Sequence, residues 1–125
     1  MARAPQPWQG TVGTASSEGA PNLVLLCGRV SGTPLETTLP SGDVVVSVRV
    51  VVDRPDRTRK PPYVDTIDCA AWTARTRRSV LSWQEGDLVA VEGALRRRFW
   101  RSGTVAQSRY EVEMSAVRRL ERGSS

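Results

Sequence analysis

Hydrophobic residues between positions 22 and 120 fall into short runs that have the spacing of β-strands and are separated by turn signals. In the clearest run, valine occupies every second position from Val44 to Val52, which directs one apolar face toward a core. The sequence PSGD at 40–43 precedes that run as a turn. On this basis, strands are predicted at residues 22–30, 44–52, 64–72, 88–95 and 110–117.

The run at 110–117 alternates between apolar and polar residues, so it predicts one inward and one outward face. The inward set is Tyr110, Val112, Met114 and Ala116, and the outward set is Glu111, Glu113 and Ser115. Gly28 and Gly93 interrupt two of the other runs. A glycine inside a strand is typical of a barrel bend or a β-bulge.

A short helix is predicted over residues 73–84, between the third and fourth strands, because Thr73 is a suitable N-cap and Gly86 can end a helix. Trp83 is assigned to the core from its apolar neighbours Val80 and Leu81. This element order is that of the all-β OB-fold, a small five-stranded Greek-key barrel with one short helix between strands 3 and 4. Sandwiches and half-barrels are also built from five strands, so the order alone leaves them open.

The two ends of the chain differ in composition from the segment between them. Residues 1–21 are rich in alanine, proline and glycine, which predicts a disordered N-terminal tail that includes Trp8. Residues 22–120 form the predicted OB-fold domain, and residues 121–125 a short polar C-terminal tail. No segment suits a signal peptide, and the apolar run at 23–27 is far too short to span a membrane. We therefore expect a cytoplasmic protein without a membrane partner.

The chain is basic, with 18 Lys and Arg against 13 Asp and Glu, a net charge of +5 and a pI of about 10.2. Its positive charge is segregated into clusters, and the rest of the chain is net acidic. Besides Arg54, the clusters comprise Arg57, Arg59 and Lys60; Arg75, Arg77 and Arg78; and Arg96, Arg97, Arg98 and Arg101. Segregated charge favours a binding face for a polyanion over generic solubility, and guanidinium groups both bind phosphate and stack on bases.

The sequence offers few residues for an active site or a metal site. The chain contains no histidine, and it contains no Walker, Rossmann or nucleophile-elbow motif. The cysteines Cys27 and Cys69 are too few for a zinc site and lie in apolar runs, so they are expected to be core residues with free thiols. We expect no enzymatic activity, no metal, no cofactor and no small-molecule substrate.

Aromatic residues accompany two of the basic clusters. Trp72 ends the third predicted strand just before Arg75, and Phe99 and Trp100 lie within RRRFWR at 96–101, which is too charged for a core. Aromatic rings that stack on unpaired bases, beside cations that neutralise the backbone, are what single-stranded nucleic acid requires. The sequence therefore predicts a single-strand binding face.

Several short sequence motifs also resemble, in their order and spacing, those of the bacterial single-stranded-DNA-binding protein family. They are LCGRV at 26–30, LPSGD at 39–43, IDCAAW at 67–72, EGDLVAVEGAL at 85–95 and RRRFW at 96–100. The resemblance implies an OB-fold that binds single-stranded DNA without sequence preference in replication, repair or recombination. It also implies a homotetramer, with Trp72 and Trp100 at stacking positions and Arg96 and Arg98 at basic ones, in a protein that associates with the nucleoid.

The sequence departs from the family pattern at three places. Thr66 replaces an aromatic residue ahead of Ile67, the region 54–56 replaces a loop tryptophan, and the acidic tip that family members use to recruit enzymes is not in this sequence. Each missing stack corresponds to about 1–3 kcal/mol per base, which the basic loop at 57–60 would offset in part. Two alternatives stay open: an RNA-binding or primosomal OB module, and a protein-interaction OB paralogue.

Overall fold

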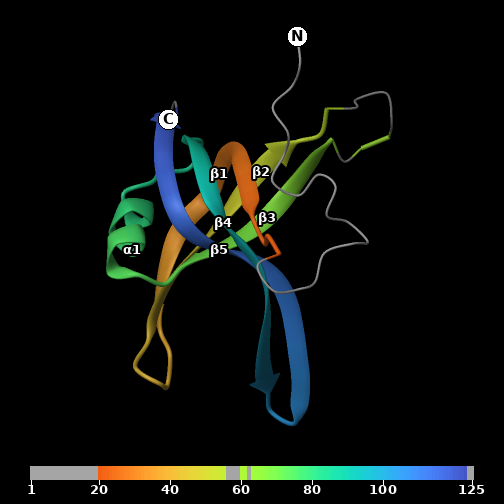
Figure 1. The fold of residues 1–125 in the computed structure, drawn as a ribbon, viewed down its shortest axis with the longest axis vertical. Coiled ribbons are helices and arrows are strands. Elements are labelled where there is room, and N and C mark those ends of the chain that lie inside the picture. The colour runs from red at the N-terminus through yellow and green to blue at the C-terminus, as the bar shows by residue number, and fades with distance from the viewer. Residues whose placement is uncertain (1–19, 56–59, 62, 124–125) are drawn as a thin grey trace.

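The computed structural model describes residues 20–55, 60–61 and 63–123. Its elements, in chain order, are β1 (Val24–Thr38), β2 (Val44–Asp53), β3 (Val64–Ala71), α1 (Ala74–Leu81), β4 (Leu88–Ser102) and β5 (Val105–Glu121). Figure 1 shows β4 and β5 continuing together as a long hairpin beyond the rest of the molecule. The predicted disordered tail, with Trp8, lies outside the described residues apart from its last two positions, 20 and 21.

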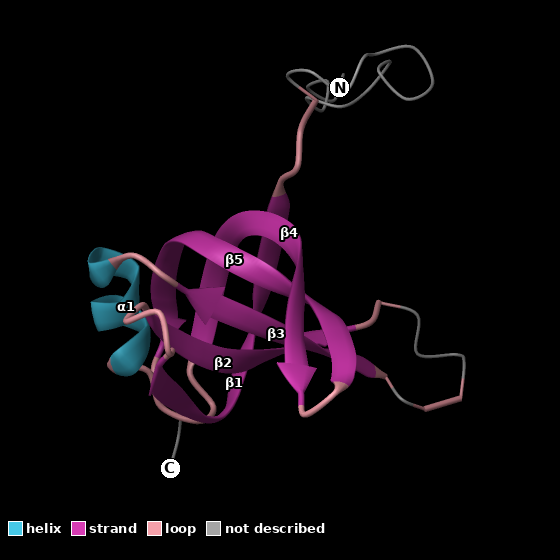
Figure 2. Cartoon of the chain, turned by 90° about the horizontal axis from the view of Figure 1, so that it is seen from below, coloured by secondary structure: helices cyan, strands magenta, loops and turns pink. Residues whose placement is uncertain are grey.

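The strands close into a barrel in the order β1-β2-β3-β5-β4. All neighbouring pairs are antiparallel except β3 and β5, which pair in parallel through Cys69 and Ala70. Figure 2 shows the strands curving around one another with α1 packed beside them. This arrangement confirms the predicted all-β OB-fold with one short helix between β3 and β4.

The core lies inside the barrel and is built mainly from alternate residues of the strands. Val46, Val48 and Val50 are buried, as the valine alternation predicts. Trp83 is also buried and belongs to the same cluster, together with Val80 of α1. The assignment of Trp83 to the core is therefore confirmed.

Two glycines allow the barrel strands to approach one another closely. A Cβ atom on Gly28 would lie 2.3 Å from the carbonyl oxygen of Val51, and one on Gly93 would lie 2.1 Å from that of Glu113. Gly93 also sits at a shift of register between β4 and β5. The expected bulge is confirmed at Gly93, whereas at Gly28 the structure shows a close approach of backbones that leaves no room for a side chain.

The predicted faces of β5 are partly wrong. Val112 and Met114 are buried, but Tyr110 and Ala116 are exposed, and Glu111 is buried. The register shift at Glu92 and Gly93 reverses the alternation, so Val117 takes the inward position expected of Ala116. Tyr110 lies on the part of the hairpin that extends beyond the core. Glu111 is covered because the guanidinium of Arg98 binds it.

Three strands are longer than predicted. β1 continues to Thr38, β4 continues to Ser102, and β5 begins at Val105. The added part of the β4–β5 hairpin pairs continuously from Arg96 opposite Glu111 to Ser102 opposite Val105. Both of its faces are largely exposed, so it lacks the apolar alternation on which the prediction rested.

The helix begins where expected but ends earlier. The hydroxyl of Thr73 accepts a hydrogen bond from the backbone N–H of Thr76, which confirms Thr73 as the N-cap. The helix ends at Leu81, and its last turn is closed by the N–H of Ser82, which donates to the carbonyl of Ser79, and by the N–H of Trp83, which donates to that of Val80. Gly86, at a φ of +90°, belongs to the turn before β4 rather than to the helix end.

The two cysteines differ in environment, and both are free. Cys69 is buried as predicted, and burial raises the pKa of its thiol to about 12, with further contributions from Asp68 and Glu111. A thiol with such a pKa stays protonated and unreactive near neutral pH. Cys27 is exposed, which corrects its assignment to the core: it points outward from β1, opposite Ala90 of β4.

The C-terminal end of the described chain is tied to the barrel by Asp87. This buried carboxylate accepts hydrogen bonds from the backbone N–H groups of Gln84 and Gly123, at 2.9 and 2.8 Å. Burial raises the pKa of Asp87, but these hydrogen bonds and the charge of Arg122 more than offset it, so the net shift is downward. β5 ends at Glu121, one residue past the predicted domain boundary.

Candidate nucleic-acid interface

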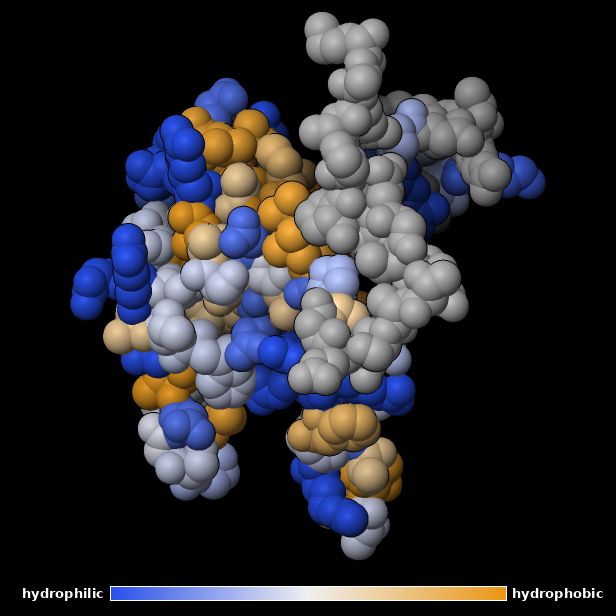
Figure 3. All heavy atoms as spheres, viewed as in Figure 1, coloured by the Kyte–Doolittle hydropathy of each residue, from blue (hydrophilic) through white to orange (hydrophobic). Residues whose placement is uncertain are grey.

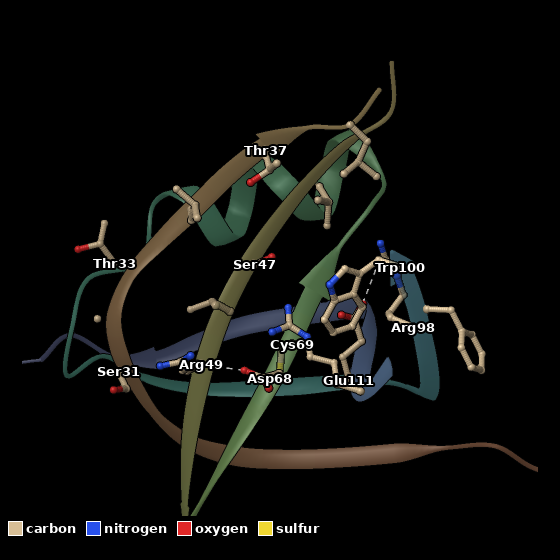
Figure 4. A pocket seen from close by; sticks show the side chains of 17 residues that line it. Ser31, Thr33, Thr37, Ser47, Arg49, Asp68, Cys69, Arg98, Trp100 and Glu111 are labelled. Carbon is tan, nitrogen blue, oxygen red and sulfur yellow. Dashed lines mark hydrogen bonds and ion pairs between the residues drawn. The ribbon is translucent and has the colours of Figure 1, made fainter. Parts of the chain in front are cut away.

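A groove of about 740 Å³ runs across the outer surface of β2 and β3. Its sides are formed by the second half of β1 from Ser31 onward, with Leu39 just after it, and by the β4–β5 hairpin. Figure 4 shows side chains from β1, β2, β3 and the hairpin around it. None of the residues that line it comes from α1.

The floor of the groove carries polar side chains of β2 and β3. Ser47 and Arg49 alternate with the buried valines of β2 and therefore point outward. The Nε of Arg49 donates to Oδ1 of Asp68 at 3.4 Å, and the side chain of Arg49 is 66% exposed. Arg49 is thus an accessible cation at the base of the groove.

Arg98 joins the hairpin wall to the end of β3. Its guanidinium carbon lies 4.3 Å from the centre of the Trp72 ring, and its Nη1 donates to Oε2 of Glu111 at 3.3 Å. Arg98 is consequently held between an aromatic ring and a buried carboxylate. One face of Trp72 is covered by this contact, so Trp72 does not offer that face directly to a base.

Trp100 is the aromatic side chain that projects into the groove. Figure 4 shows its indole extending from the hairpin toward the floor at Cys69 and Asp68. Trp100 is 42% exposed, and the guanidinium carbon of Arg109 lies 5.7 Å from its ring centre. An exposed ring backed by a cation is a suitable platform for an unpaired base.

Several arginines around the groove are compensated by carboxylates. Arg96 donates to Glu113 at 2.9 Å, as Arg98 does to Glu111. Farther away, Arg54 donates to Asp65 at 2.7 Å, and this hydrogen bond lowers the pKa of Asp65. Within the described part of the chain, Arg109 has no carboxylate partner, so its charge is available to a phosphate.

The structure brings only part of the predicted basic set to the groove. Arg75 and Arg78 are exposed on α1, and Lys60 is exposed at the end of the β2–β3 loop. Arg77 is half-buried, where its guanidinium donates to the carbonyl oxygens of Val44 and Trp72. Arg77 therefore fastens α1 to the barrel. Arg57 and Arg59 lie outside the described residues.

Two groove arginines are absent from the predicted site, Arg49 and Arg109. Each is isolated from the three sequence clusters and reaches the groove only through the strand pairing. Arg49 could have been found from its outward position in the alternating run of β2. Arg109 could not be assigned a face in this way because it lies just before the strand predicted at 110–117. Phe99 borders the groove, whereas Arg97 and Arg101, which share its face of β4, do not line it.

The sequence pattern of the single-strand binding protein family matches residues 21–120, which includes the whole of the predicted domain. The chain belongs to this family. Single-stranded DNA binding is therefore its activity. A solved structure described as the Plasmodium falciparum single-strand binding protein in complex with single-stranded DNA has the same fold. It superposes with a TM-score of 0.66 at 21% identity, over 82% of this chain and 96% of that chain. No curated protein matches the sequence.

The described residues contain neither a group of three potential metal ligands nor a helix long and apolar enough to cross a membrane. The groove itself presents aromatic rings and guanidinium groups, those of Phe99, Trp100, Arg49, Arg98 and Arg109. Trp72 and Trp100 both match stacking positions of the family, but the two side chains have different environments in this protein. Trp100 is exposed in the groove, and Trp72 is stacked beneath Arg98.

Proposed function

We propose that the groove binds single-stranded DNA without sequence preference, by stacking unpaired bases on Trp100 and neutralising phosphates with arginine. The observation that carries this proposal is the exposed Trp100 ring inside a groove that also holds Arg49 and Arg109. Stacking tolerates any sequence because every base has a π-face. The protein acts by covering the strand rather than by catalysis.

Trp72 contributes through Arg98. A guanidinium group is planar, so Arg98 can stack on the Trp72 ring with one face and receive a base on the other. Glu111 keeps Arg98 in this orientation by accepting its hydrogen bond. A base bound there would rest on a cation that is already in place, which reduces the entropy lost on binding.

Arg49 is suited to contact a phosphate. Its ion pair with Asp68 is exposed and long, and such pairs contribute little to stability. Arg49 can therefore exchange Asp68 for a phosphate of the bound strand, because breaking the ion pair costs little free energy. Together with Arg98 and Arg109, it places cations on the floor and on the hairpin wall of the groove.

The affinity for oligo-dT should fall steeply with salt. If about five cations of each chain meet phosphates, the plot of log affinity against log salt should have a slope of about −3.5. Titrations at several salt concentrations measure this slope, with oligo-U as the comparison. A slope near zero would exclude the arginines as the DNA contact, and tighter binding of oligo-U would favour the RNA-binding alternative.

We also infer a homotetramer. Support comes from an apolar hollow of about 380 Å³ on the outer surface of β1, β4 and β5, which includes Leu25, Cys27 and Ala116. Leu25 is 65% exposed, which is unfavourable for a lone subunit. Sedimentation at micromolar concentration should give about four times the chain mass of 13.7 kDa. A single species at the chain mass would contradict this inference.

The cellular role that fits these properties is protection of single-stranded DNA during replication, repair or recombination. A sequence-independent binder with a net charge of +5 suits transient strands of any sequence. We place it in the bacterial cytoplasm in association with the nucleoid, a location that follows from its DNA partner and from the motifs it shares with the bacterial family.

A further inference from the structure

The β4–β5 hairpin has two faces, and the groove uses mainly one of them, with Phe99 of the other face at its border. Successive residues of a strand point to opposite faces, so Arg96, Arg98 and Trp100 share one face and Arg97, Phe99 and Arg101 share the other. The contacts agree with this division. Arg98 binds Glu111 on the first face, whereas Arg97 binds Ser108 and Tyr110 on the second. We call the second face, formed by Arg97, Phe99, Ser108 and Tyr110, the far face.

Arg97 is held at the centre of the far face by neutral partners. Its Nε and Nη2 donate to the hydroxyl of Ser108 at 3.1 and 2.8 Å, and its Nη1 donates to the Tyr110 hydroxyl at 3.3 Å. Its guanidinium carbon lies 5.5 Å from the Phe99 ring centre and 5.1 Å from that of Tyr110. No carboxylate contacts it within residues 20–55, 60–61 and 63–123.

This arrangement distinguishes Arg97 from its neighbours. Arg96 and Arg98 are compensated by Glu113 and Glu111, so binding a phosphate there must compete with a carboxylate. Arg97 is equally well positioned but keeps its full charge. A fixed and uncompensated guanidinium is a preorganised anion site.

The aromatic rings beside Arg97 are open to solvent. Phe99 is 72% exposed and Tyr110 is 59% exposed, and each has Arg97 near its ring. Figure 3 shows hydrophobic and hydrophilic side chains next to one another on the lower end of the hairpin. Exposed rings beside a free cation provide the same combination that the groove provides with Trp100 and Arg109.

We propose that the far face is a second contact site for the same DNA strand, which leaves the groove, crosses the hairpin and stacks bases on Phe99 and Tyr110. Two observations favour DNA as the occupant. The positive charge of Arg97 complements a phosphate, and Phe99 also borders the groove, so the two sites are continuous. The inference rests on the proposed function of the groove, and it adds a length of strand that the groove alone does not cover.

The test compares a short and a long oligo-dT, about 5 and about 20 nucleotides, since one OB-fold covers roughly 4–16. Phe99→Ala should weaken binding of the long oligomer by at least about 5-fold and leave the short one within about 2-fold. Arg97→Gln should have the same length dependence and reduce the salt slope of the long oligomer by about 0.7. Trp100→Ala is the matched groove variant and should weaken both oligomers.

The outcomes separate the two proposals. Normal binding of the long oligomer by both far-face variants, or an equal loss for both lengths, would overturn the second site. A change in sedimentation without a change in DNA affinity would make the far face a protein interface, which also overturns it. Trp100→Ala without effect on either length would overturn the groove instead. Thermal melting of each variant checks that the barrel is folded, as expected for substitutions at exposed positions.

Discussion

Replacing Trp83 with alanine is expected to lower the free energy of unfolding by about 3–5 kcal/mol. Trp83 is only 4% exposed and packs in the core cluster beside Val80, at the point where the chain leaves α1. Its backbone N–H also donates to the carbonyl of Val80 at 3.0 Å, which leaves little freedom for the chain to close the cavity. Urea denaturation of the variant and the parent measures the difference.

Trp83→Phe is the matched control and should lose less stability, because it retains a large apolar ring at the site. The DNA affinity of folded Trp83→Phe should equal that of the parent, since Trp83 does not line the groove. A Trp83→Ala protein as stable as the parent would show that this side chain is not a core element. The position of α1 against the barrel would then need another explanation.

The barrel was predictable because its inner face consists of apolar residues at every second position of the strands. The valines of β2 directed Val46, Val48 and Val50 inward, and the glycines marked the close approaches at Gly28 and Gly93. Both signals arise from local physics: a strand buries every second side chain, and only glycine fits where two backbones nearly touch. The fold class followed from these signals and the position of the helix.

The hairpin was not predictable in the same way. Its strands are stabilised by backbone pairing and by contacts between exposed side chains, such as Arg96 with Glu113, rather than by burial. A period in hydrophobicity does not report such contacts. The same limit explains why Glu111 was assigned to the outside, since its burial depends on Arg98 reaching it across the hairpin.

The sequence therefore predicted which types of residue form the candidate site but not how they are arranged in space. Aromatic and basic residues within 96–101 indicated nucleic-acid binding, yet the sequence could not show that they divide between two faces. Nor could it show that Arg77 binds backbone carbonyls or that Arg109 backs Trp100. These relations depend on strand register and helix placement, which link residues far apart in the sequence.

Replacing Trp100 with alanine is expected to weaken oligo-dT binding by about 1–3 kcal/mol, because the groove loses its projecting aromatic ring. Stability should change little, since Trp100 lies on the hairpin beyond the core and is 42% exposed. The matched control is Trp100→Phe, which keeps a ring at the site and should retain part of the stacking energy. Trp83→Phe serves as a control for a substitution outside the groove.

The most direct measurement is a titration of Trp100→Ala and the parent with oligo-dT and with duplex of the same length, alongside a thermal melt of each protein. For the parent, oligo-dT should quench tryptophan fluorescence and bind much more tightly than duplex, because paired bases cannot reach the ring. The variant should bind oligo-dT more weakly at an unchanged melting temperature. A Trp100→Ala protein that binds oligo-dT normally but melts early would contradict the account, because Trp100 would then be a packing residue and not a base platform.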